Sequence, residues 1–306
     1  MLKTKDLLGL ENLTKKEIEL ILDTAINFKG VFTRSVKKVP ALRGKTVVNL
    51  FYEPSTRTSK SFEVAAQRLS ADVIDITTSM SSVVKGESLI DIGKTLEAMK
   101  ADFVVIRHAM AGTPKILAEN ISAAVINAGD GFHEHPTQGL LDLYTIRENL
   151  DEIKGLKVVI VGDIGHSRVA KSNILALNKF GAKVTVVGPP TLIPDSIKEM
   201  GVDIEYNLKK ALENADVVNI LRIQLERQNK NLFPSLREYT ALYKVTPEIL
   251  KYAKKSVLIM HPGPMNRGIE ISSEVVNLKN AVINEQVTNG IAIRMAILYL
   301  LAKANK

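Results

Sequence analysis

The sequence predicts an α/β protein that contains two doubly wound parallel-sheet domains. Short apolar runs typical of buried strands alternate with helical segments in both halves of the chain, which is the pattern of parallel sheets covered by helices. The 306 residues, with 45% hydrophobic content, are enough for about two domains with substantial cores. Polar and cationic side chains also follow most of the predicted strands, where open parallel sheets bind ligands.

The first half begins with a helix and continues with four predicted strands. Thr14 and Glu17 fit a capping box, and the apolar residues that follow indicate one helical face. A strand begins at Val47 and ends before Pro54, and further strands are predicted at 72–76, 103–106 and 124–126. Helices are predicted after Pro54, over 87–100, and from Pro136 to Leu150, since proline suits a first helical turn.

The second half repeats this alternation. Strands are predicted at 158–161, 184–187, 217–221 and 257–260, with helices between them. The last helix, around 291–300, is strongly apolar, but Arg294 and its length argue against a membrane span. Because each half has its own strands and helices, we expect two separate sheets.

Composition excludes several classes of function. The chain has no cysteine, so disulfides, Cys-based zinc sites and thiol catalysis are excluded. The N-terminus lacks an apolar signal region, and we expect a cytoplasmic protein with no membrane partner. The net charge of +8 invites a nucleic-acid partner, but the basic residues are mixed with acidic ones and aromatics make up only 5%. A small polyanionic substrate is the better prediction.

The most informative stretch is Ser55-Thr56-Arg57-Thr58, which follows the first strand and begins a helix. A helix N-terminus offers unpaired N–H groups and a positive partial charge, so it favours an anion. Three hydroxyls and a guanidinium able to bind phosphate in a bidentate way strengthen that preference. The simpler alternative is that Ser55 only caps the helix.

Two other motifs give weaker indications, one of a metal site and one of a dinucleotide site. His133-Glu134-His135 is the only tempting metal cluster, but it precedes Pro136 in a loop, and we expect neither a metal nor a cofactor. The turn that begins at Gly162 resembles the start of a dinucleotide fingerprint. Ile164 occupies the position of its middle glycine, so a dehydrogenase is disfavoured.

In their order along the chain, several motifs resemble the aspartate/ornithine carbamoyltransferase family, and its aspartate-specific members most of all. The matching blocks cover nearly the whole chain: Ser55-Thr56-Arg57-Thr58, Lys85-Gly86-Glu87, Arg107-His108, His135-Pro136-Thr137-Gln138, Arg168, Arg222-Ile223-Gln224 and His261-Pro262-Gly263-Pro264. The resemblance implies transfer of a carbamoyl group from carbamoyl phosphate to L-aspartate. It also implies domains at 1–134 with 288–306 and at 135–287, with the active site between them.

The resemblance assigns expected roles to these residues. Ser55, Thr56, Arg57, Thr58 and Arg107 hold the phosphate in the family, and Arg107, His135 and Thr58 surround the carbamoyl oxygen. Gln138 and the backbone of Gly263 and Pro264 take the carbamoyl amino group. Arg168, Arg222 and Gln224 receive the two carboxylates of aspartate. Ser81 and Lys85 come from the adjacent subunit of a homotrimer, and the sequence leaves open whether regulatory chains also bind.

Two rival readings share the phosphate motif. Ornithine carbamoyltransferase is the nearer one, but the family form usually carries His-Cys-Leu-Pro where this chain has His261-Pro262-Gly263-Pro264. A second carboxylate also suits Arg222 better than the second amine of ornithine would. A non-catalytic anion-binding relative would be free to lose Lys85 or the aspartate arginines, and this chain keeps them.

Overall fold

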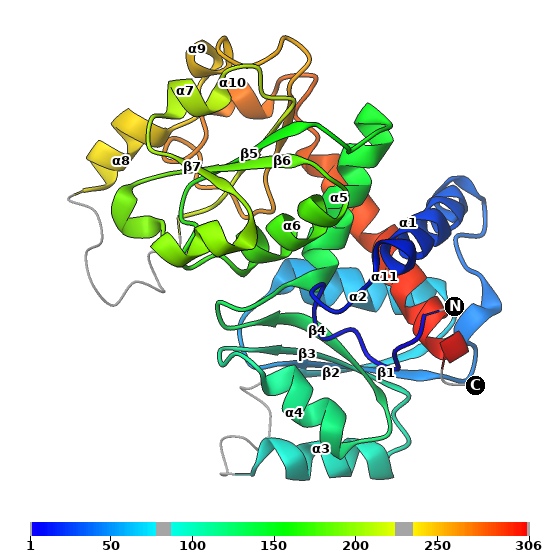
Figure 1. Cartoon of the computed structure of the whole chain (residues 1–306). Helices are drawn as coiled ribbons and strands as arrows, with labels where there is room; N and C mark the ends of the chain where they lie inside the picture. Colours follow the sequence, from blue (N-terminus) through cyan, green and yellow to red (C-terminus); the bar gives the residue numbers. More distant parts are fainter. Residues whose placement is uncertain (1, 78–86, 224–234, 305–306) are drawn as a thin grey trace. The chain divides into compact units, whose positions relative to one another are not determined.

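The computed structural model describes residues 2–77, 87–223 and 235–304. The chain divides into two compact units, unit 1 (Met1–Leu141 and Val287–Lys306) and unit 2 (Asp142–Gln286). Each unit has one parallel sheet with helices on both faces, which confirms the predicted fold class (Figure 1). Two helices, α5 (Pro136–Leu150) and α11 (Ile283–Ala304), contribute residues to both units.

Unit 1 contains a four-stranded sheet in the order β2-β1-β3-β4. Its strands are β1 (Thr46–Phe51), β2 (Asp72–Thr77), β3 (Phe103–His108) and β4 (Ala124–Asp130), and all their pairings are parallel. From β1 the chain moves outward to β2 and then returns to the other side of β1 for β3. The strand order therefore reverses between β1 and β3, the place where doubly wound sheets bind ligands.

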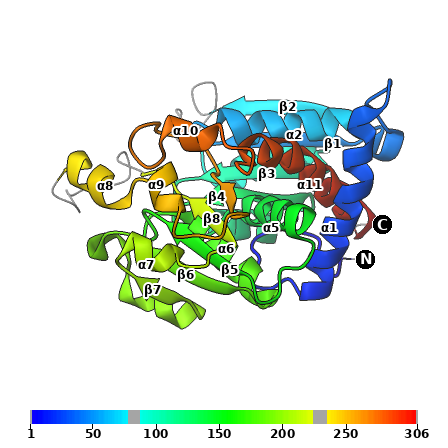
Figure 2. The ribbon, with the colours of Figure 1, turned by 90° about the horizontal axis from the view of Figure 1, so that it is seen from above.

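Helices cover both faces of the unit 1 sheet (Figure 1). On one face, α3 (Leu89–Ala98) and α4 (Thr113–Asn120) bury Val48, Leu50, Val104 and Ile106 of the strands. The other face carries α1 (Lys15–Lys29), α2 (Thr56–Arg68) and the unit 1 part of α11. Figure 2 shows α2 and α11 side by side, and the Arg294 guanidinium of α11 donates a hydrogen bond to Ser61 of α2.

Unit 2 contains a five-stranded parallel sheet in the order β7-β6-β5-β8-β9. The strands are β5 (Lys157–Val161), β6 (Lys183–Val187), β7 (Asp203–Glu205), β8 (Val217–Ile220) and β9 (Leu258–Met260). The order reverses between β5 and β8, because β6 and β7 lie on one side of β5 while β8 and β9 lie on the other. The prediction missed β7, which is only three residues long and carries two acidic side chains.

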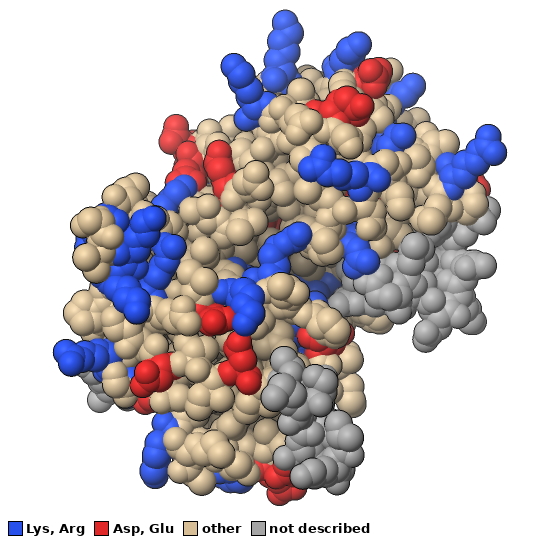
Figure 3. Space-filling model, turned by 180° about the vertical axis from the view of Figure 1, so that it is seen from behind, with Lys and Arg blue, Asp and Glu red and all other residues tan. Residues whose placement is uncertain are grey.

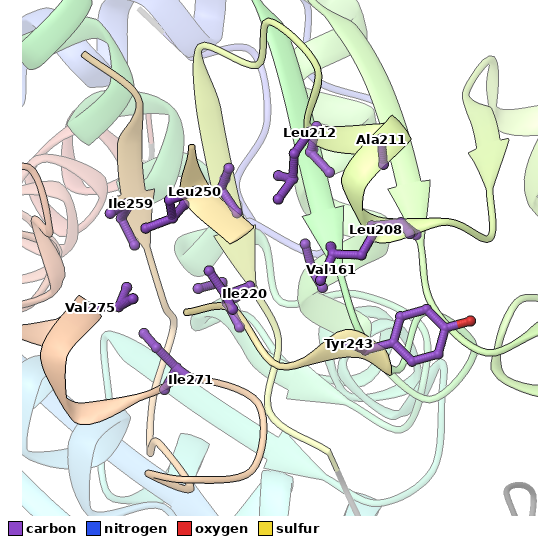
Figure 4. Packing of buried hydrophobic residues seen from close by; sticks show 14 of the residues in the cluster. Val161, Leu208, Ala211, Leu212, Ile220, Tyr243, Leu250, Ile259, Ile271 and Val275 are labelled. Atoms are coloured by element: carbon purple, nitrogen blue, oxygen red, sulfur yellow. The ribbon is translucent and has the colours of Figure 1, made fainter. Parts of the chain in front are cut away.

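One hydrophobic cluster of unit 2 lies on one face of this sheet. Four helices meet the strands there: α7 (Leu208–Leu212), α8 (Leu236–Tyr243), α9 (Pro247–Leu250) and α10 (Ser273–Val276). Figure 4 shows Val161, Ile220 and Ile259 of the strands among the apolar side chains of these helices. Helix α6 (Arg168–Lys179) lies on the other face (Figure 1). This core holds the ends of β5 and β8 in place.

Helix α11 needs separate comment because of its length. Among the described residues it is the one helix long and apolar enough to cross a membrane by length and composition. However, 61% of its most apolar window is buried inside the protein, as in the core helix of a soluble protein. Its apolar character is therefore explained by packing.

The surface charge is mixed on the face that Figure 3 presents. Lys and Arg side chains stand there among Asp and Glu side chains over much of the molecule. This view agrees with the interspersed charges of the sequence. A continuous basic surface, as nucleic-acid binding requires, is not visible on this face.

Candidate functional site

In unit 1 the predicted phosphate donors lie where the strand order reverses. Helix α2 begins at Thr56, five residues after β1 ends at Phe51, and Arg107 is next to the last residue of neighbouring β3. The two strand ends are tied together, because the Tyr52 amide donates to the Arg107 carbonyl at 2.9 Å. Residues about fifty positions apart in sequence therefore lie close together at the carboxyl ends of these two strands.

Ser55 precedes α2 but does not cap it. Its side chain makes no capping hydrogen bond, whereas Ser88 and Ser167 accept from backbone amides at the starts of α3 and α6. The first turn of α2 also contains no acidic residue. The simple capping alternative is therefore wrong for Ser55, and the positive end of α2 is left without a side-chain acceptor from its own N-cap.

The two arginines of this edge differ in their surroundings. Partial loss of water lowers the pKa of Arg57 from its ordinary value, although a guanidinium remains charged at neutral pH. Arg107 is half-buried, and its Nε lies 3.3 Å from Oε2 of Glu53. Glu53 thus orients the Arg107 side chain. The sequence interpretation missed Glu53, although an acidic residue beside a cluster of anion donors was a visible signal.

His135 and Gln138 lie at the start of α5 and are both buried, with 4% and 8% exposure. The His135 carbonyl accepts the Gln138 amide at 2.9 Å, which forms the first turn after Pro136. Thr58, within the first turn of α2, is also buried. Unit 1 therefore contains buried polar side chains on two helix starts besides the exposed Arg57.

His133 and Glu134, the other members of the candidate metal motif His133-Glu134-His135, have structural partners. Both carboxylate oxygens of Glu134 accept the Leu10 amide, and Nδ1 of His133 lies 3.0 Å from Asp130. Burial raises the pKa of Asp130, but hydrogen bonds from His133 and from the Gly112 amide outweigh it and lower the pKa overall. Structural roles in the loop after β4 therefore explain Glu134 and His133.

In unit 2 the turn after β5 is built by close packing. A Cβ on Gly162 would lie 3.1 Å from the Leu221 carbonyl oxygen, and φ is +127° at this glycine. Asp163 is fully buried and accepts Nδ1 of His166 at 2.8 Å. Ile164 is also fully buried, so its side chain packs in the core where a dinucleotide fingerprint needs a glycine.

Arg168 and Arg222 lie at the reversal point of the unit 2 sheet. Arg168 is the first residue of α6, directly after the capping Ser167, and is only 2% exposed. Arg222 follows β8 and is half-buried, while the Leu221 amide donates to the Val161 carbonyl of β5 at 2.8 Å. Predicted residues Ser81, Lys85 and Gln224 lie outside the described residues.

The turn after β9 is held by a buried histidine. The Gly263 amide donates to Nδ1 of His261 at 2.8 Å, and Nε2 of His261 lies 3.2 Å from Oε1 of Glu270. Gly263 has φ of +65°, in the left-handed region that favours glycine, and its peptide bond to Pro264 is cis. The sequence interpretation missed Glu270, which is nine residues beyond its histidine.

Comparison with known proteins links both units to one family. The description "Aspartate/ornithine carbamoyltransferase, carbamoyl-P binding domain" matches residues 5–148, and the "Asp/Orn binding domain" of the same family matches residues 154–301. A relative from Endomicrobium trichonymphae, named aspartate carbamoyltransferase catalytic subunit, is 68% identical over 100% of this chain and 98% of its own.

Solved structures of this family have the same fold. An aspartate transcarbamoylase from Trypanosoma cruzi, in complex with carbamoyl phosphate and aspartate, is similar with a TM-score of 0.89 and 29% identity over 97% of each chain. An ornithine carbamoyltransferase from Pyrococcus furiosus is similar with a TM-score of 0.84 and 32% identity, over 96% of this chain and 95% of its own. The fold is therefore common to enzymes with two different amine substrates.

Proposed function

Because the chain belongs to the aspartate/ornithine carbamoyltransferase family, we propose that it transfers the carbamoyl group of carbamoyl phosphate to the amine of L-aspartate. The observation that carries the proposal is the uncapped start of α2, where Ser55 to Thr58 meet the end of the strand that carries Arg107. This arrangement suits a phosphate group. The name of the 68% identical relative favours aspartate over ornithine as the acceptor.

Carbamoyl phosphate is the proposed ligand of the unit 1 residues. The hydroxyls of Ser55, Thr56 and Thr58, the guanidinium groups of Arg57 and Arg107, and the amides of the first turn of α2 would surround its phosphate. His135, Thr58 and Arg107 would donate to the carbamoyl oxygen. Gln138, together with the backbone at Gly263 and Pro264, would receive the amino group.

L-Aspartate is the proposed ligand of Arg168, Arg222 and Gln224. Two guanidinium groups match the two carboxylates of this substrate, since each can bind a carboxylate through two parallel N–H bonds. Ornithine has one carboxylate and a second amine, which a second guanidinium would repel. The charge of these two side chains therefore supports aspartate as the acceptor.

The proposed reaction needs neither a protein nucleophile nor a metal-bound water. The aspartate amine attacks the carbonyl carbon, a C–N bond forms, and the tetrahedral intermediate carries its negative charge on the former carbonyl oxygen. When the intermediate collapses, the C–O bond to phosphate breaks and the departing phosphate accepts the amine proton. Catalysis comes from holding two mutually repelling anions together and from donors aimed at the developing oxyanion.

Assembly and location are further parts of the proposal. In line with the family resemblance, we propose a cytoplasmic homotrimer of pyrimidine biosynthesis in which Ser81 and Lys85 of one subunit complete the site of the next. Sedimentation of the protein alone tests the trimer, and sedimentation with candidate regulatory chains tests whether a larger assembly forms. A monomeric mass under assay conditions would overturn the shared site.

The direct test offers L-aspartate and L-ornithine separately, each with carbamoyl phosphate, and measures the carbamoylated product and released phosphate. We expect stoichiometric N-carbamoyl-L-aspartate and phosphate with aspartate, and no carbamoylated product with ornithine. Product with ornithine alone would replace the proposal by the rival activity. Binding of carbamoyl phosphate without turnover of either amine would instead support the non-catalytic relative.

A further inference from the structure

Unit 2 contains a buried carboxylate, Asp142, for which the proposed reaction gives no role. It lies on α5, is 1% exposed, and receives three side-chain amide groups. Nδ2 of Asn173 lies 2.8 Å from Oδ2, Nδ2 of Asn219 lies 3.4 Å from the same oxygen, and Nε2 of Gln286 lies 2.7 Å from Oδ1. These partners come from α6, β8 and α11, so one side chain connects four elements.

A carboxylate at this position sets the direction of every hydrogen bond around it. An ionised carboxylate only accepts, so each neighbouring amide must turn its NH2 group toward Asp142. Gln286 therefore has to present its Oε1 on its other side. A flipped Gln286 would turn its NH2 group toward the His261 amide and its oxygen toward the carboxylate, and the loss of both hydrogen bonds in a buried site disfavours that arrangement.

The side-chain oxygen of Gln286 connects this arrangement to the turn after β9. Oε1 accepts the His261 amide at 2.9 Å, and His261 in turn accepts the Gly263 amide through Nδ1. Because Nδ1 accepts, a neutral His261 carries its proton on Nε2, which faces Oε1 of Glu270. Each of these residues is nearly or fully buried except Gly263. A continuous chain of hydrogen bonds thus runs from Asp142 to the backbone of Gly263.

We propose that Asp142 is a positioning residue that, through Gln286 and His261, fixes the Gly263-Pro264 backbone for the carbamoyl amino group. The inference rests on the proposed function, which assigns that group to this backbone. Asp142 itself does not touch substrate in this proposal. Its effect is specific: it should change how the protein recognises the amino group and leave the phosphate donors of unit 1 unchanged.

The matched variants are Asp142→Asn and the double variant Asp142→Asn with Gln286→Glu. In the single variant the new amide can satisfy Asn173 and Asn219 with its oxygen, but its NH2 group then faces the NH2 group of Gln286. In the double variant the new carboxylate at position 286 accepts from both the amide at position 142 and the His261 amide. The hydrogen bonds are restored with one direction reversed and the carboxylate moves from position 142 to position 286, so recovery in this variant shows that the hydrogen-bonded connection between the two positions holds the turn, and not an aspartate at position 142 as such.

Binding of two ligands by the intact protein tests the specificity. Acetyl phosphate carries a methyl group where carbamoyl phosphate carries its amino group. We expect Asp142→Asn to weaken the binding of carbamoyl phosphate about two- to tenfold, the range for one misaligned neutral hydrogen bond. The binding of acetyl phosphate should weaken by less than about twofold. The double variant should regain most of the loss. Equal weakening of both ligands would mean a merely structural role and overturn the proposal.

Hydrogen exchange of the intact protein gives a readout that does not depend on the proposed function. Amides of the segment 258–266 should exchange faster in Asp142→Asn and return toward wild-type rates in the double variant. Unchanged exchange in Asp142→Asn would overturn the link between Asp142 and the turn. If the wild-type protein bound neither ligand, the proposed function would fail, and exchange would still decide whether Asp142 holds the turn.

Asp216→Asn is the control. Asp216 is also in unit 2, directly precedes β8, and accepts at both oxygens, from the Lys157 amide at 2.9 Å and from Nζ of Lys254 at 2.6 Å. Neither of these contacts involves the turn after β9, so the variant should leave the ratio of the two affinities at the wild-type value. A shift in that ratio equal to the shift in Asp142→Asn would show that any lost carboxylate in unit 2 has this effect, and would overturn the proposal.

Discussion

Both units present cationic groups where the strand order of their sheet reverses, but the residues that supply these groups are arranged differently along the chain in the two units. In unit 1, four consecutive residues from Ser55 to Thr58 provide most of the donors, and the helix start adds its own amides. In unit 2, Arg168 and Arg222 are 54 positions apart in the sequence. The turn after β9 depends on buried residues from several elements of the same unit. A local motif therefore defines one proposed ligand site, whereas long-range packing defines the other.

The largest expected effect tests the unit 1 donors. Arg107→Ala should lower kcat about 10²- to 10³-fold, because it removes a donor to the developing oxyanion as well as a phosphate contact. Steady-state kinetics with both substrates measure the change, with the exposed Arg43→Ala of the same unit as the control. Wild-type turnover in Arg107→Ala would remove Arg107 from the proposed site.

A smaller effect with a different kinetic signature is expected in unit 2. Arg222→Ala should raise the KM for aspartate roughly 10- to 100-fold, the range for one hydrogen bond to a charged group. The affinity for carbamoyl phosphate should stay the same, since the unit 1 donors are intact. The exposed Arg237→Ala is the control. An unchanged aspartate KM in Arg222→Ala would contradict the assignment of this arginine to a carboxylate.

Two serines at equivalent helix starts sharpen the comparison further. Ser167 caps α6 and Ser55 does not cap α2. Ser167→Ala should therefore reduce the free energy of unfolding by about 1 kcal/mol. Ser55→Ala should leave the free energy of unfolding within about 0.5 kcal/mol of the wild-type value but weaken phosphate binding about tenfold. Denaturant unfolding and phosphate titration of both variants measure this contrast, and equal loss of stability would contradict it.

The smallest effect concerns pH and unit 1 alone. Hydrogen bonds from the Ser122 side chain and backbone, with help from Lys94, lower the pKa of Glu97 from 4.5 to about 2. A lowered pKa means that the folded state favours the ionised form, so this stabilisation is complete above pH 4.5 and is lost as pH falls toward 2. Glu97→Gln should flatten the acid limb of the stability curve slightly, as measured by denaturant unfolding at a series of pH values. An identical pH profile would refute this.

The sequence was most informative where structure is local. The apolar runs predicted eight of the nine strands in the described part of the chain, and the Ser55 to Thr58 cluster indicated a helix start, because both signals lie within a few residues. Asp142 gave no such signal, since a polar residue on a helix is usually solvent-exposed. Its partners lie 31, 77 and 144 positions away, so only the fold reveals that they meet.

The division of the chain also has a consequence for its synthesis. Unit 2 is continuous from Asp142 to Gln286, whereas unit 1 needs Val287–Lys306 in addition to its first 141 residues. Arg294, which joins Ser61 on α2, is in that later segment. Unit 1 therefore lacks part of its structure until the last residues of the chain have been translated, and α2, which carries the proposed phosphate donors, gains its contact with Arg294 only at the end of synthesis.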